Sequence, residues 1–334
     1  MLRAHLENYT SKPRIFWLTR ALVREAVRNN PDLSGRVRFS VGDDLATLAG
    51  NLRDADALVT SSDVLLDTRF PRARLREAAP RLKLIHIIGA GIEGLLPLDW
   101  VPSGIRLTNN SGVHARKARE FQLMALLALN ARLPAIVFNQ RHARWEQLFT
   151  PSIAGKKLVV VGLGDMGRAA VAAARLLGLR IVGVRRSRRR VPGVETIYPP
   201  DKIVVALKGA DFLVIAAPLT PESANLVNRR ALAAMRSGAG VVNVARGGIL
   251  DHEALAELLE SGHLSGAILD VFVTEPLPAS SRLWSLPNVI VNPHVSSDDA
   301  ERYMLDTMNL VCRNLRRLQG NRRLENVVSA ARGY

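Results

Sequence analysis

Short apolar runs alternate with longer amphipathic stretches over most of the chain, a pattern that is typical of parallel α/β domains. In the first hundred residues, the apolar runs predict strands at 15–18, 57–60 and 84–88. In the second half, they predict strands at 158–162, 180–184, 212–216, 240–244, 266–270 and 288–291. Helical patterns separate most of these runs. The chain is therefore expected to fold into two doubly wound units with parallel sheets.

Two longer amphipathic stretches divide the chain between these units. One Ala/Leu-rich helix is predicted over residues 113–133, ending before a proline, and another is predicted over residues 299–318. The first helix would carry the chain out of the first domain, and the second would return it. We therefore expect one domain to comprise residues 1–110 plus 299–334 and an inserted domain to comprise residues 111–298.

The most specific local motif follows the predicted strand at 158–162. Residues 162–167 read Gly-Leu-Gly-Asp-Met-Gly, a G-x-G-x-x-G turn between a buried strand and an Ala-rich helix. Gly162 would allow a tight turn, Gly164 would let the backbone approach a pyrophosphate, and Gly167 would let the helix pack against the strand. The helix N-terminus would then favour the phosphates. The motif predicts a dinucleotide-binding turn, and a plain βαβ turn without a ligand is the alternative.

The composition is that of a globular protein of two ordinary domains. The chain has 334 residues, of which 48% are hydrophobic and 23% are charged. No apolar run approaches the roughly 20 residues that cross a bilayer, and residues 1–7 lack an apolar signal core. We therefore expect a cytoplasmic protein with no membrane association. The single cysteine, Cys312, excludes an intramolecular disulfide and a cysteine-based metal cluster, and no metal site is predicted.

The formal net charge of +16 comes mostly from 39 arginines, against 7 lysines. A positive field would steer anionic substrates and a phosphorylated cofactor toward a cleft. Nucleic-acid binding is the rival explanation, but the chain has no zinc-finger spacing or RNA-recognition motif and only 5% aromatic residues. We therefore expect no specific nucleic-acid partner.

The end of the second strand of the inserted domain indicates which dinucleotide binds. In NAD-binding versions of this arrangement, that strand ends in Asp or Glu, which accepts hydrogen bonds from ribose hydroxyls. Here the sequence reads Val184-Arg185-Arg186-Ser187. A guanidinium group can bind a 2′-phosphate bidentately, and no carboxylate stands there to repel it. NADP(H) is therefore favoured, with NAD(H) as the alternative, whereas residues 188–190 are interpreted as a solvated basic loop.

Three further segments place polar groups just after predicted strands, where open α/β sheets bind ligands. They are residues 243–248 with Arg246, residues 269–276 with Asp270 and Glu275, and residues 292–297 with His294. Together they are more specific than the glycine turn. The other six histidines have no comparable setting and are interpreted as surface or core residues: His5, His86, His114, His142, His252 and His263.

Taken together, these motifs resemble those of the D-isomer-specific 2-hydroxyacid dehydrogenases, which include glyoxylate/hydroxypyruvate reductases and phosphoglycerate dehydrogenases. The resemblance covers nearly the whole chain and rests on residues 162–167, 217–221, 246–248, 270–276 and 293–294. It implies a flavodoxin-like substrate domain, an inserted Rossmann dinucleotide-binding domain and a homodimer. It also implies a small 2-keto acid or D-2-hydroxy acid as substrate, bound between two domains that close on it.

The family's catalytic Arg, Glu and His match Arg246, Glu275 and His294, which are therefore the predicted catalytic residues. His294 would donate a proton to the carbonyl oxygen as hydride arrives from the nicotinamide. Glu275 would orient the imidazole and stabilise the imidazolium, while Arg246 would bind the substrate carboxylate and polarise the carbonyl. Backbone amides at Gly89 and Ala90 match the family's loop for the substrate carboxylate.

The full set of predicted cofactor contacts is Gly162, Gly164, Asp165, Met166, Gly167, Arg185, Arg186, Ser187, Pro218, Val244, Asp270 and Ser297. Two segments depart from the family pattern. Residues 117–121 read Lys-Ala-Arg-Glu-Phe where a V-A-E-H-like sequence is common. Residues 295–299 read Val-Ser-Ser-Asp-Asp in place of a glycine-rich continuation after the catalytic His. A cofactor-sensing scaffold, like the transcriptional corepressors of this fold, is the alternative function.

Overall fold

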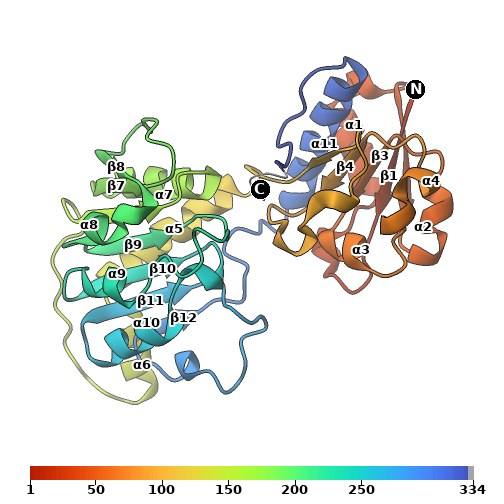
Figure 1. The fold of residues 1–334 in the computed structure, drawn as a ribbon. Helices are drawn as coiled ribbons and strands as arrows, with labels where there is room; N and C mark the ends of the chain where they lie inside the picture. The colour runs from red at the N-terminus through yellow and green to blue at the C-terminus, as the bar shows by residue number, and fades with distance from the viewer. Residues whose placement is uncertain (330–334) are drawn as a thin grey trace. The chain divides into compact units, whose positions relative to one another are not determined.

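The computed structural model describes residues 1–329, which fold as two compact units (Figure 1). Unit 1 comprises Met1–Val113 and the chain from Asp299 onward, and unit 2 comprises His114–Asp298. The chain thus enters unit 2 after residue 113, three residues later than the boundary expected from the sequence, and leaves it at the expected residue 298.

Unit 1 is built on a five-stranded parallel sheet in the order β2-β1-β3-β4-β5. The strands are β1 (Leu2–Glu7), β2 (Val37–Gly42), β3 (Ala57–Thr60), β4 (Leu84–Ile87) and β5 (Arg106–Thr108). One apolar cluster joins the sheet to α1 (Arg20–Asn29) and α11 (Tyr303–Gln319). A second cluster joins it to α2 (Leu45–Leu52), α3 (Ser62–Leu66) and α4 (Leu75–Ala78). This strand order is flavodoxin-like, so the predicted fold class of this unit is confirmed.

The strand predicted at residues 15–18 is wrong. Residues Arg14–Phe16 form a single 3-10 turn, η1, after Pro13. The Phe16 ring packs edge-on against Tyr303 of α11, with ring centroids 5.6 Å apart. The apolar run therefore serves packing against a helix, which a run of four apolar residues cannot distinguish from a strand.

Strand β1 was not predicted because two polar residues interrupt its apolar pattern. His5 and Glu7 are both buried, and His5 Nε2 lies 2.8 Å from Glu7 Oε2. The other ring nitrogen of His5 lies 2.9 Å from the Ser40 hydroxyl on β2. Pairing of polar groups across the strands thus allows a buried central strand with a polar sequence.

Unit 2 contains a seven-stranded parallel sheet in the order β12-β11-β10-β9-β6-β7-β8. Its strands are β6 (Lys157–Val161), β7 (Arg180–Val184), β8 (Thr196–Tyr198), β9 (Phe212–Ile215), β10 (Ala239–Asn243), β11 (Leu264–Leu269) and β12 (Val289–Val291). The six predicted strands are present, and β8 is an additional, short edge strand. The order extends outward in both directions from β6, which confirms the predicted Rossmann fold.

Helices of unit 2 cover both faces of this sheet. One apolar cluster includes α5 (Ala115–Asn130) and α7 (Asp165–Leu176), and the other includes α8 (Ile203–Leu207), α9 (Arg229–Ala233) and α10 (His252–Glu260). The helix expected to end before Pro134 ends at Asn130, and Pro134 instead lies in the first turn of α6 (Leu133–Arg141). Within residues 1–329, no single helix is long and apolar enough to cross a membrane, although α5 and α6, bent by 68°, pass that test together.

Candidate active site

The predicted site residues of unit 2 follow neighbouring strands at one edge of its sheet. His294 follows β12, Glu275 follows β11 and Arg246 follows β10, and these three strands are adjacent. The predicted cofactor residues follow the next strands in the same order, with Pro218 after β9, the glycine turn after β6 and Arg185 after β7. Because carboxyl ends of parallel strands share one edge, the topology alone brings these groups to one side of the unit.

The glycine turn has the shape required of an anion cradle. Gly162 has a φ of +89°, and a Cβ there would lie 2.6 Å from the backbone of Ala217 on the neighbouring segment. A Cβ at Gly167 would lie 1.9 Å from the carbonyl oxygen of Gly162. A Cβ at Gly164 would meet nothing within 4 Å, and Gly164, the N-cap residue of α7, has no side chain with which to cap the helix. The turn therefore leaves open space and unpaired helix amides where a phosphate group fits.

His294 and Glu275 form a direct pair. His294 Nδ1 lies 2.7 Å from Glu275 Oε2, and the other carboxylate oxygen accepts a hydrogen bond of 2.9 Å from the Phe272 amide. The two side chains are 49% and 36% exposed, respectively. Glu275 is thus held by its own loop, and its contact with Nδ1 leaves Nε2 of His294 as the ring nitrogen that can serve a bound molecule.

Asp270 anchors the loop that carries His294. One carboxylate oxygen accepts hydrogen bonds of 3.0 Å from the amides of both Val295 and Ser296. The same carboxylate also accepts from the Asn292 side chain and the Ser296 hydroxyl. Asp270 is buried, so these bonds satisfy a carboxylate that water does not reach. The structure therefore gives this predicted cofactor residue a second task, that of fixing residues 292–296.

Arg246 follows β10 on a loop that packs tightly against the Glu275 loop. A Cβ at Gly247 would lie 2.0 Å from the backbone of Phe272, so only glycine fits there. The atoms that crowd Gly247 belong to the protein's own backbone and not to a ligand site. This close approach places the Arg246 loop beside the segment that carries Glu275.

The arginines after β7 lie at the end of the strand where the sequence predicts a 2′-phosphate site. The amide of Arg185 donates to the carbonyl of Tyr198 and so continues the β7–β8 pairing. Arg185 is half-buried, and Arg186 and Ser187 are exposed. A hydrogen bond from Thr220 lowers the pKa of Glu222 most, and the charge of Arg186 contributes to the same shift. The positive charge of Arg186 thus acts on a carboxylate of the segment after β9.

In the predicted carboxylate-binding loop of unit 1, the backbone carbonyls accept hydrogen bonds from two asparagines. Asn110 donates to the carbonyls of Ile88 and Gly89, through its side chain at 2.7 Å and its amide at 3.0 Å. The Asn109 side chain donates to the Ala90 carbonyl at 2.7 Å. Within residues 1–329, the amides of Gly89 and Ala90 donate no hydrogen bond, so they remain free to bind an anion. The two asparagines were not predicted, because their role depends on contacts with a distant strand end.

Two further residues of unit 2 accompany the catalytic group although the sequence interpretation gave them no role. His114 Nδ1 lies 3.4 Å from the Ser297 carbonyl oxygen and 3.8 Å from Asp298 Oδ1. Burial lowers the pKa of His114, Asp298 opposes this shift, and the charges of Arg246 and His294 add to it. No local motif marks His114, because the residues around it belong to other elements.

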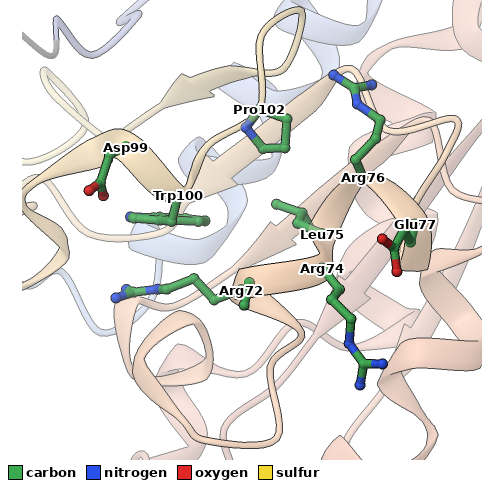
Figure 2. Close-up of a pocket in the computed structure, with 9 residues that line it drawn as sticks. Arg72, Arg74, Leu75, Arg76, Glu77, Asp99, Trp100 and Pro102 are labelled. Atoms are coloured by element: carbon green, nitrogen blue, oxygen red, sulfur yellow. The ribbon is translucent and has the colours of Figure 1, made fainter.

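A cavity of about 270 Å³ lies elsewhere in the molecule, within unit 1 (Figure 2). The Arg72 guanidinium lies over the Trp100 ring, 4.6 Å from its centroid, while Arg74 and Arg76 extend away from it (Figure 2). The cavity shares no residue with any predicted site. The contact of Arg72 with Trp100 joins the segment around Trp100 to the turn that precedes α4.

Comparison with known sequences identifies the family. A family model described as "D-isomer specific 2-hydroxyacid dehydrogenase, NAD binding domain" matches residues 123–296. A D-3-phosphoglycerate dehydrogenase of Mycobacterium bovis is 33% identical over 271 residues, 79% of this chain and 49% of that protein. A glyoxylate reductase of Thermofilum pendens is 32% identical over 263 residues, 76% of each chain. The chain spans about half the length of the phosphoglycerate dehydrogenases it matches.

Solved structures resemble this chain over its full length. A D-isomer specific 2-hydroxyacid dehydrogenase of Xanthobacter autotrophicus Py2, solved with NADPH and MES, is 26% identical, with a TM-score of 0.81 over 99% of both chains. An NADPH-dependent glyoxylate/hydroxypyruvate reductase of Sinorhizobium meliloti, solved with NADP and sulfate, is 27% identical, with a TM-score of 0.79 over 100% of both chains. The chain therefore belongs to the D-isomer-specific 2-hydroxyacid dehydrogenases, which are NAD(P)-dependent oxidoreductases, and the predicted family is confirmed.

Proposed function

We propose that this protein is an NADP(H)-preferring reductase of small 2-keto acids, with glyoxylate and hydroxypyruvate as the first candidates. The observation that carries the proposal is the pairing of His294 Nδ1 with Glu275 at 2.7 Å, on a loop anchored by buried Asp270. Such a pair holds an imidazole in one tautomer and stabilises its charged form. The relatives named as glyoxylate reductases support the choice of substrate class.

The chemistry needs one proton donor and one cation. The reduced nicotinamide, when bound, supplies the hydride that adds to the C2 carbon of the keto acid. As that C–H bond forms, the carbonyl π electrons move to oxygen, and His294 Nε2 gives this oxygen its proton. Glu275 stabilises the imidazolium before transfer, and Arg246 attracts the substrate carboxylate and the growing charge on oxygen. The product is a 2-hydroxy acid, and His294 is left neutral.

The glycine turn and the first turn of α7 would hold the cofactor's pyrophosphate. Gly162 and Gly164 provide the space, and the amides of Asp165, Met166 and Gly167 provide donors. Arg185 and Arg186 would bind the 2′-phosphate, with Ser187 as a further donor. Two solved relatives carry NADPH or NADP by their own descriptions, which supports this preference.

Initial rates of NADPH and NADH oxidation with a panel of 2-keto acids test the proposal. Glyoxylate, hydroxypyruvate, pyruvate, phenylpyruvate and 2-ketoisocaproate sample small, polar and bulky side chains. We expect turnover that favours NADPH and the two smallest polar substrates. His294→Ala should lower kcat by about 10³-fold while the dissociation constant for NADPH stays within about threefold. Near-normal turnover of this variant would show that another group donates the proton.

The cofactor preference has its own test. We expect Arg185→Ala combined with Arg186→Ala to raise KM for NADPH by about tenfold or more and to leave KM for NADH nearly unchanged. Arg189→Ala combined with Arg190→Ala is the matched control, because it removes the same charge from the same loop. Equal effects of the two double variants would mean that the loop acts only through its overall charge.

We further propose that two copies of the chain form a homodimer through residues 124–149. This stretch exposes large apolar side chains, and Trp145 and Phe149 are 96% and 86% exposed. Hydrogen bonds hold both ends of the segment that carries these two residues. The Arg144 amide donates to the Asn139 carbonyl, and the Asn130 side chain donates to the Pro151 carbonyl. Trp145→Ser combined with Phe149→Ser should shift the mass measured by light scattering from dimer to monomer. A wild-type monomer at micromolar concentration would contradict this proposal.

The cofactor-sensing scaffold remains the second candidate function, and the same rate panel separates it from the enzyme. A scaffold binds NADPH but shows no efficient 2-keto acid substrate. Because corepressors of this fold keep the catalytic group, the His294–Glu275 pair does not separate the two functions and the rate panel decides between them.

A further inference from the structure

The segment after His294 is one of the two places where this chain departs from the family pattern, and the structure shows which contacts the different residues make. Ser296, Ser297 and Asp298 stand where glycines are common. Ser296 donates its amide and its hydroxyl to Asp270, which fixes the first half of the segment. His294 itself has a φ of +56°, a left-handed conformation that a non-glycine residue keeps only when its surroundings hold it.

The second half of the segment is held by His114, the residue that precedes helix α5. Its ring nitrogen Nδ1 lies 3.4 Å from the Ser297 carbonyl oxygen and 3.8 Å from the Asp298 carboxylate. The side chains of His114 and Asp298 are only 13% and 22% exposed. Residues 114 and 298 are also the first and last residues of unit 2, so this contact joins its two chain ends. The loop of His294 is thus anchored by Asp270 on one side and by His114 on the other.

The charges around this pair are unequal. Burial lowers the pKa of His114, with Asp298 and the Ser297 carbonyl opposing and Arg246 and His294 adding to the shift. Burial raises the pKa of Asp298, with His114 and His294 opposing and Asp270 adding to the shift. Burial and the neighbouring Arg246 and His294 thus disfavour a positive charge on His114. The Asp298 amide donates to the carbonyl of Val295, the residue after His294, so Asp298 is a second carboxylate, besides Glu275, in the loop that carries the imidazole.

We propose that His114 and Asp298 are positioning residues for His294: His114 holds the Ser297–Asp298 backbone, and the Asp298 carboxylate favours the protonated imidazole. The inference rests on the proposed role of His294 as proton donor. Neither residue touches the reacting atoms in this scheme. Asp298 acts through its charge, whereas His114 acts through the position of the loop. Substituting Asp298 should therefore change the pH dependence of turnover, and substituting His114 should change kcat.

The test measures kcat for keto-acid reduction against pH in the full-length protein with saturating NADPH. Asp298→Asn should move the pH at which reduction falls to half downward by about 0.5 to 1 unit, because less negative charge favours proton loss from His294. Asp201→Asn, an exposed carboxylate of the same unit, should not move it. His114→Ala should lower kcat about tenfold at all pH values, and His114→Asn, whose amide can replace Nδ1–H, should restore most of that loss.

A second readout does not depend on turnover. The His294 ring resonances are titrated by NMR in wild type and Asp298→Asn, both with unchanged urea midpoints. A downward shift of the His294 titration midpoint in the variant supports the proposal even if no 2-keto acid is reduced, a result that would overturn only the proposed function. An unchanged midpoint, or His114→Ala with wild-type kcat in an active enzyme, would overturn the positioning role.

Discussion

The glycine turn at 162–167 and the His294 loop at 292–298 lie at the same edge of one sheet but are built in different ways. The turn is shaped by the absence of side chains, since a Cβ at Gly162 or Gly167 would strike backbone atoms. The loop is shaped by side chains, since Asp270 and His114 hold it through polar contacts with its backbone. Backbone amides alone can bind a nucleotide phosphate. A proton donor must be a side chain that is held in a fixed position relative to the reacting atoms.

This difference predicts different kinds of damage. A methyl group added to the turn acts through sterics on folding or on the pyrophosphate. A polar group changed in the loop acts through hydrogen bonds on the orientation of His294. Three substitutions in unit 2 and one pH titration in unit 1 measure the contrast, from the largest expected effect to the smallest.

Gly167→Ala should be the most damaging change. Its Cβ would lie 1.9 Å from the Gly162 carbonyl oxygen, so helix α7 must move away from β6. We expect the free energy of unfolding of unit 2 to fall by about 3 kcal/mol, measured from urea midpoints. A stability within about 0.5 kcal/mol of wild type would show that the turn can relax, and the contrast with the loop would then weaken.

A pH titration extends the comparison to the loop of Gly89 in unit 1, the predicted anion site, whose carbonyls accept hydrogen bonds from Asn109 and Asn110. Burial lowers the pKa of His86 to about 4, with its hydrogen bond to Asn110 opposing. The folded state therefore binds fewer protons than the unfolded chain between pH 6.5 and 4. Stability from neutral His86 is present above pH 6.5 and is lost as the pH falls toward 4, by up to about 3 kcal/mol. His86→Gln should flatten this dependence, whereas exposed His142→Gln should leave it unchanged.

Asp270→Asn should weaken the loop without touching the turn. An amide group would face donors from the backbone and from Ser296, so we expect a loss of about 1 to 3 kcal/mol in stability. Turnover should fall more than tenfold because His294 loses its anchor, and Ser296→Ala should have a smaller effect on both. Calorimetry with NADPH then decides between two roles. An unchanged affinity indicates anchoring alone, and a large loss indicates the predicted cofactor contact.

Gly164→Ala should have the smallest effect on the protein and a selective effect on its ligand. Its Cβ would meet nothing within 4 Å, so the urea midpoint should match wild type. The added methyl would stand where the pyrophosphate approaches, and we expect the dissociation constant for NADPH to rise about tenfold. Unchanged affinity in this variant would place the phosphates elsewhere.

The local pattern of apolar residues was sufficient to predict strands wherever a strand is a continuous apolar run. The apolar runs located β3, β4 and six strands of unit 2, and parallel topology then assigned the residues that follow them to one edge. Pattern failed at residues 15–18, where an apolar run packs on α11, and at β1, where buried His5 contacts both Glu7 and the Ser40 hydroxyl of β2. In both places, contacts with residues far along the chain contribute to the structure.

The sequence by itself therefore determined the family, the two parallel sheets and the glycine turn, because periodicity and missing side chains are local properties. The family resemblance implied the contact of Glu275 with His294, whereas only the tertiary structure decided that Asp270 is buried beside the loop and that His114 reaches Asp298. It also decided that Gly247 is crowded by backbone. Such contacts depend on how strand ends are spaced in the folded sheet, which no local pattern of residues encodes.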